Sequence, residues 1–103
     1  MLNLLLGAIL GALATVMLVV VIVAYLNWDK LKDWIFGYRK LCVEDKDNIA
    51  FSITEKVEKG KASIVHGVFN KRTEQIVTGA KVTAKEVDPE VIKAHADKLV
   101  VYD

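Results

Sequence analysis

The pattern of hydrophobic and polar positions divides the 103-residue chain into three parts, of which the first is an apolar run. Positions 4–26 are uncharged and mostly apolar, and every acidic and basic residue lies after Trp28. As an α-helix, this run extends about 34 Å, which is enough to cross a hydrocarbon core of roughly 30 Å. Its β-branched stretch 19–23 favours a strand in water, but in lipid the need for internal hydrogen bonds outweighs that preference. The pattern therefore predicts a single N-terminal transmembrane α-helix within residues 1–28.

A cleaved signal peptide is the competing interpretation of this run. It requires a basic N-terminal region, a shorter apolar stretch and small residues at a cleavage site. Nothing basic precedes the run, and the small residues Ala12 and Ala14 lie in its middle. These features favour a retained helix over a secreted or periplasmic domain.

The flanking charges predict the orientation of the helix. The basic residues near its ends all follow it, and they are Lys30, Lys32, Arg39 and Lys40. By the positive-inside rule, the N-terminus is then outside and the C-terminal part is cytoplasmic. A single Cys42 agrees with a reducing compartment. The predicted location is the inner (plasma) membrane of a cell.

Small residues recur at four-residue spacing in the apolar run. Gly7 and Gly11 form a G-x-x-x-G pair that Thr15 extends, and Ala8 and Ala12 lie beside them. Small residues let helix backbones approach closely in lipid, so these five positions predict a helix–helix interface with a second copy or another membrane subunit. The alternative is that Gly and Ala are simply frequent in spanning helices.

Residues 29–42 carry an amphipathic helical pattern next to the apolar run. Its tryptophans and basic residues are typical of a juxtamembrane helix that lies along lipid headgroups. The positions predicted to lie at the membrane surface are Trp28, Lys30, Leu31, Lys32, Trp34, Ile35, Tyr38, Arg39 and Lys40. The alternative is that the apolar face packs on the folded domain or on a neighbouring copy.

Residues 43–103 predict a small α+β domain with the element order β-β-β-α-β. Alternation of apolar and polar residues indicates strands near 49–54, 62–69 and 75–84, with a turn at Lys59-Gly60-Lys61. Asp88-Pro89-Glu90 is a helix start, because Asp is a good N-cap and Pro suits the first helical position. The helix is expected to extend to about Ala96, and a last strand to cover 99–102.

The inventory of chemical groups argues against an enzyme. His66 and His95 have no acid or Cys at a metal-binding spacing, so neither a metal nor another cofactor is predicted. Gly60-Lys61 lacks the other residues of a phosphate-binding loop. An enzyme would become plausible only if His66, His95 and Cys42 converged in one pocket. With Lys and Arg together at 14 and Asp and Glu at 13, the charge balance also argues against nucleic-acid binding.

These features together predict a non-enzymatic single-pass membrane protein that works by assembly. Its expected partners are the lipid bilayer and other membrane subunits or copies of itself. Two forms remain open, an accessory subunit of a larger complex and a self-assembling scaffold such as a ring, a filament or a virion membrane component. A holin-like pore-former is the less favoured alternative, because the apolar run offers little polar surface to line a channel.

Overall fold

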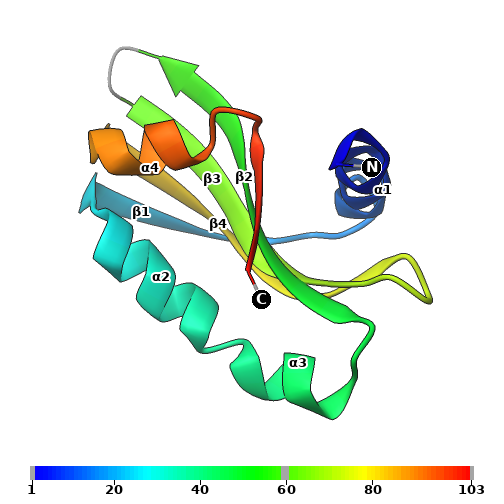
Figure 1. The fold of residues 1–103 in the computed structure, drawn as a ribbon. Coiled ribbons are helices and arrows are strands. Elements are labelled where there is room, and N and C mark those ends of the chain that lie inside the picture. Colours follow the sequence, from blue (N-terminus) through cyan, green and yellow to red (C-terminus); the bar gives the residue numbers. More distant parts are fainter. Residues whose placement is uncertain (1, 59–60, 103) are drawn as a thin grey trace.

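The computed structural model describes residues 2–58 and 61–102, which form one five-stranded mixed sheet with helices on both faces (Figure 1). In chain order the elements are α1 (Leu2–Leu13), β1 (Val19–Leu26), α2 (Trp28–Phe36), α3 (Arg39–Glu44), β2 (Asn48–Glu58), β3 (Lys61–Asn70), β4 (Gln75–Val87), α4 (Pro89–Ala94) and β5 (Leu99–Tyr102). The strand order is β1-β4-β3-β2-β5. Strand β1 is parallel to β4, and the other pairs are antiparallel.

The prediction of a transmembrane helix is wrong, and so are the membrane and single-pass assignments that followed from it. The apolar run is divided between α1, of 12 residues, and β1, of eight. Within residues 2–58 and 61–102, no helix combines the length and the apolar character needed to cross a membrane. The physical reason is that β4 offers β1 a hydrogen-bonding partner. Pairing with β4 then satisfies one side of the Val19–Leu26 backbone, and its β-branched side chains keep the extended conformation that they prefer.

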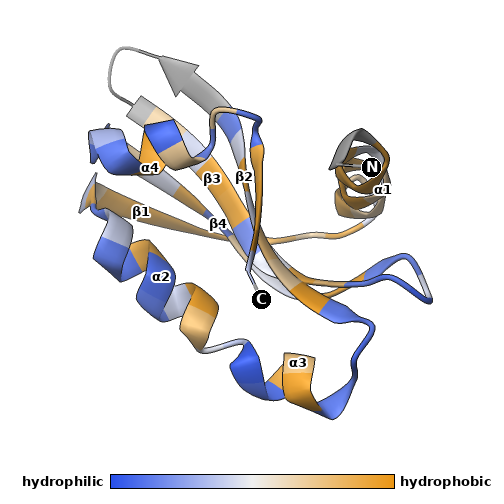
Figure 2. Ribbon diagram, viewed as in Figure 1, coloured by the Kyte–Doolittle hydropathy of each residue, from blue (hydrophilic) through white to orange (hydrophobic). Residues whose placement is uncertain are grey.

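Helix α1 covers one face of the sheet, on the side opposite α2 (Figure 1). Its Ile9 is fully buried and packs with Phe51 and Ile53 of β2 and with Phe69 of β3. Hydrophobic colour continues along both α1 and β1 in Figure 2, but only part of this apolar surface reaches the core. The N-terminal segment is therefore a layer of the α+β fold and not a stalk in front of it.

The predicted amphipathic helix over 29–42 forms two shorter helices on the second face. Asn27 caps α2, because its side-chain oxygen accepts a hydrogen bond from the Lys30 amide at 2.6 Å. Gly37 ends the helix, and its amide donates to the Asp33 and Trp34 carbonyls. Helix α2 buries Leu31 and Ile35 against the sheet, and α3 adds Cys42 to the edge of the same core.

Strands β2, β3 and β4, helix α4 and strand β5 follow the order β-β-β-α-β predicted from the sequence. Asp88 caps α4 through its side chain, which accepts from the Glu90 amide at 3.0 Å, as the Asp-Pro-Glu pattern indicated. The helix ends at Ala94, two residues before the predicted end. The predicted turn at Lys59-Gly60 lies outside the described residues.

Strands β3 and β4 approach each other closely where two glycines face each other. Gly67 lies opposite Gly79 in the register of the two strands. A Cβ atom on Gly67 would overlap the Thr78 carbonyl oxygen, so a side chain at this position would force the strands apart. This close contact lies one residue from His66, in the middle strand of the sheet.

Candidate functional site

A row of polar side chains crosses the sheet beneath α2 and α4. Ser52 on β2 lies opposite His66 on β3, so both side chains occupy the same face of the sheet. His95, just after α4, reaches Ser52 from above, with Nε2 at 2.6 Å from Oγ. The Tyr102 hydroxyl on β5 contacts the same Oγ, also at 2.6 Å. Two histidines and a serine that are far apart in the sequence are thereby gathered on one buried face.

The hydrogen bonds around Ser52 have a defined direction. The Nδ1 atom of His95 lies 2.6 Å from the Val91 carbonyl, which can only accept, so Nδ1 carries the proton. Nε2 then accepts the Ser52 hydroxyl proton, and Tyr102 donates its own proton to Ser52. Burial lowers the pKa of His95 and raises the pKa of Tyr102, which keeps both groups neutral.

His66 is held in a second group of contacts on the side towards β1. Its Nδ1 lies 2.8 Å from the Tyr38 hydroxyl, and its ring stacks on Trp34 with 5.3 Å between the ring centroids. Burial lowers the pKa of His66 to about 4, so the imidazole is neutral near pH 7. A cavity of about 380 Å³ borders these three side chains.

The distance between Ser52 and His95 is typical of a nucleophile and its general base, but a substrate has no access to the Ser52 hydroxyl. Ser52 is fully buried, and both of its hydrogen-bonding partners belong to the protein. A reacting carbonyl would need space beside Oγ, and neither of the two described cavities includes Ser52. The arrangement ties α4 and β5 to β2.

The convergence that would have favoured an enzyme does not occur in the described part of the chain. His66 borders the 380 Å³ cavity, Cys42 borders a separate one of about 640 Å³, and His95 lines neither. Among residues 2–58 and 61–102, no three His, Cys, Asp or Glu side chains are grouped to hold a metal ion.

The small residues predicted to form a helix–helix interface are divided between two environments. Gly7 and Gly11 are exposed on α1, with open space where a Cβ atom would be. Ala8 and Ala12 pack at the margin of the core beneath α1. Thr15 follows the end of the helix, where its hydroxyl donates to the Ala12 carbonyl at 2.9 Å.

The residues predicted to lie at a membrane surface are also divided. The apolar members pack against the sheet, which is the alternative that the sequence left open, and they are Trp28, Leu31, Trp34, Ile35 and Tyr38. The basic members are exposed and comprise Lys30, Lys32, Arg39 and Lys40. Two of these lysines lie over indole rings, Lys30 over Trp34 and Lys32 over Trp28, each 5.6 Å from the ring centroid.

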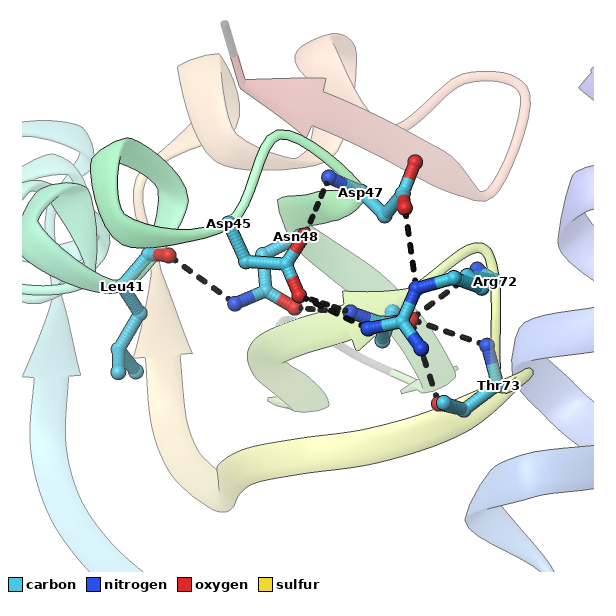
Figure 3. Close-up of polar contacts among 7 residues, drawn as sticks. Leu41, Asp45, Asp47, Asn48, Arg72 and Thr73 are labelled. Carbon is cyan, nitrogen blue, oxygen red and sulfur yellow. Dashed lines mark hydrogen bonds and ion pairs between the residues drawn. The ribbon is translucent and has the colours of Figure 1, made fainter.

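A polar cluster joins the turn between β3 and β4 to the segment before β2 (Figure 3). Arg72 pairs with Asp45 and with Asp47, each at 3.3 Å. Asn70 is buried, and its amide nitrogen donates to Asp45 and to Asn48. The hydrogen bond from the Asp47 amide, with smaller contributions from the neighbouring Asn70 and Arg72, lowers the pKa of Asp45 and outweighs the opposing effect of desolvation. These contacts pair the Arg72 charge with two carboxylates and hold the turn between β3 and β4 in place.

Strand β1 presents a row of exposed apolar side chains. It pairs with β4 along one side, from Val19 opposite Ala80 to Leu26 opposite Val87, and it is the end strand of the sheet. Val19 is 71% exposed and Ile22 is 74% exposed. The hydropathy pattern detected this segment in the sequence but assigned its apolar surface to contact with lipid.

Comparison with known proteins does not assign the chain to a family. No family model matches the chain, and searches of curated proteins and of solved structures found no match either.

Proposed function

We propose that this protein is a non-enzymatic assembly subunit, and that strand β1 pairs with β1 of a second copy. The observation that carries the proposal is an exposed edge strand of eight residues without a charge, a proline or a shift in register. Unpaired backbone groups along such an edge are a template for another strand, and natural edges are usually protected by charges, prolines, bulges or short length.

The opposite edge of the sheet illustrates that protection. Strand β5 has only four residues, and the charged pair Asp97-Lys98 directly precedes it. Strand β1 has twice that length, and its exposed side chains are valine, isoleucine, alanine and tyrosine. The two edges therefore differ in the way expected if only β1 pairs in the assembled protein.

A second copy is a suitable occupant because the strand is complementary to itself. In an antiparallel pair of β1 strands centred on Ile22, each residue lies opposite one on the same face of the extended sheet. Val19 then faces Tyr25, Val20 faces Ala24, and Val21 faces Val23. Every opposing pair is apolar and no like charges meet, so a two-fold contact carries no electrostatic penalty.

Native mass spectrometry of the purified full chain tests the proposal. We expect a homodimer that dissociates on dilution, and Ile22→Lys should convert it to a monomer by placing two ammonium groups opposite each other. Val77→Lys is the matched control, because Val77 is an exposed valine on β4 and should leave the dimer intact. A wild-type chain that stays monomeric at high concentration would contradict self-assembly.

Cross-linking tests the register. In a Cys42→Ser background, Ile22→Cys should form an intermolecular disulfide readily, because opposing Cα atoms in antiparallel strands lie about 4.5–5.5 Å apart. Val77→Cys should form little. Equal cross-linking of the two variants would indicate random collision and would argue against the β1 pair.

A further inference from the structure

The larger cavity lies on the second face of the sheet, between the α2–α3 pair and the edge formed by β2 and β5. Its volume is about 640 Å³, within the range of about 300–1,000 Å³ typical of small-molecule sites. Six lining residues are apolar or aromatic or carry a thiol, and these are Ile35, Phe36, Cys42, Val43, Ala50 and Tyr102. The other two are Lys32 and Arg39.

The apolar wall of this cavity continues onto the surface. Phe36 is 66% exposed and Val43 is 77% exposed, although both side chains line the cavity. Burial raises the pKa of the Cys42 thiol, so this group is neutral near pH 7 and serves as apolar lining. The Tyr102 hydroxyl is engaged with Ser52, which leaves the tyrosine ring as the surface offered to the cavity.

Among the described residues, the two charged side chains that line the cavity are both basic. Lys32 has a partner in Asp29 at 3.5 Å, but no carboxylate of the described residues lies within ion-pairing distance of Arg39. The Arg39 guanidinium instead lies over the Phe36 ring, with Cζ 5.5 Å from the centroid. This contact places a cation beside the exposed part of the apolar wall.

Arg72 and Lys81 are two cations near the sheet that do have carboxylate partners. Arg72 pairs with two aspartates, and Lys81 pairs with Glu55 at 2.6 Å. Arg39 combines a place at an apolar cavity with a positive charge that no carboxylate of the described residues pairs. That combination complements a molecule with an alkyl chain and one anionic end.

We propose that this cavity binds a free fatty acid of medium chain length, with its alkyl chain along Phe36 and Val43 and its carboxylate on Arg39. Arg39 is the principal anchor, because a guanidinium binds a carboxylate through two parallel hydrogen bonds. Lys32 is a secondary contact, since Asp29 already engages it. The site is on the face covered by α2, so its occupancy does not depend on pairing through β1.

Calorimetric titration of the full chain with decanoate tests the proposal, with decanol as the uncharged probe. We expect saturable binding of one decanoate per chain and at least tenfold weaker binding of decanol. Arg39→Gln should weaken decanoate about tenfold and leave decanol unchanged, as loss of a charge-assisted contact predicts. Phe36→Ser should weaken both probes.

Lys40→Gln is the matched control for Arg39→Gln. Lys40 is the next residue on α3, it is exposed, it does not line the cavity, and its substitution removes the same charge. Its binding of decanoate should equal that of the wild type. Equal weakening by the two substitutions would reduce the effect to general electrostatic attraction, and absence of saturable decanoate binding would overturn the proposal outright.

Discussion

The Tyr38 hydroxyl lies 2.8 Å from Nδ1 of His66, and this contact joins the turn after α2 to the middle strand of the sheet. Trp34 stacks on the same imidazole from the preceding helical turn. The segment predicted to lie at a membrane surface is therefore held on the sheet by two aromatic residues around one buried histidine. Neutrality of that histidine is a condition of this packing, because a buried imidazolium here would have no anionic partner in the described contacts.

The first prediction is that stability falls between about pH 6.5 and pH 4 because of His66. Its pKa in the folded chain is about 4, against an ordinary value of 6.5, so the unfolded chain takes up a proton first as the pH falls. The contribution of His66 to the free energy of unfolding is fully present above its pKa in the unfolded chain. It is lost as the pH falls to its pKa in the folded chain, by about 3 kcal/mol over the whole interval.

Urea unfolding at a series of pH values measures this loss. His66→Gln should be less stable than the wild type at pH 7.5, and its free energy of unfolding should depend less on pH between 6.5 and 4. His95 retains a lowered pKa and so keeps part of the slope in the variant. An identical slope in the wild type and in His66→Gln would refute the assignment.

The second prediction concerns Ser52, which accepts from Tyr102 and donates to His95. Ser52→Ala removes a hydrogen bond from the buried His95 ring and from the half-buried Tyr102 hydroxyl, and we expect it to lower the free energy of unfolding by about 1–3 kcal/mol. Ser63→Ala is the control on the neighbouring strand, where the hydroxyl makes only a long contact of 3.4 Å with Thr83. It should change stability by less than about 0.5 kcal/mol.

Local structure could be predicted from the sequence where it depends only on residues that are neighbours in the chain. The Asp88-Pro89 helix start needs only adjacent residues, and it lies where predicted. The environment of Ser52 depends on pairing with His66 and on the return of the chain to His95, 43 positions later. No sequence period encodes that meeting, so the buried polar row could not be predicted.

The prediction of a transmembrane helix from the apolar run was wrong for a related reason. Hydropathy records that Val19–Leu26 avoids water, but it does not record which backbone groups will satisfy its hydrogen bonds. In the fold, β4 supplies these partners along one side of the strand through a parallel register, and the same β-branched residues that are poor in an aqueous helix suit this strand. The hydropathy of this run alone therefore does not distinguish a transmembrane helix from an edge strand.

The third prediction ranks two residues of the cluster in Figure 3. Asn70 is buried, and its side-chain oxygen accepts from the amides of Arg72 and Thr73. Asn70→Ala should cost about 2 kcal/mol or more, because it leaves several partners unsatisfied. Arg72→Gln should cost less than about 1 kcal/mol, since its side chain is largely exposed and water screens its ion pairs.

Thermal and urea unfolding of the two variants at neutral pH checks that order. Added salt should narrow the difference between the wild type and Arg72→Gln, because screening weakens exposed ion pairs, and should leave the Asn70→Ala loss nearly unchanged. The reverse ranking would mean that the ion pairs, and not the buried amide, hold the turn.

The fourth prediction tests whether α1 belongs to the folded core. Ile9 is fully buried on the sheet, whereas Leu4 on the same helix is 80% exposed. Ile9→Ala should lower the free energy of unfolding by about 2–4 kcal/mol through lost burial and an unfilled cavity. Leu4→Ala should change it by less than about 0.5 kcal/mol. The two changes remove similar apolar side chains from one helix, so their difference isolates the contact with Phe51 and Phe69. Equal, small effects would show that α1 is not docked on the sheet in solution, and the hydrophobic face that it covers would then need another partner.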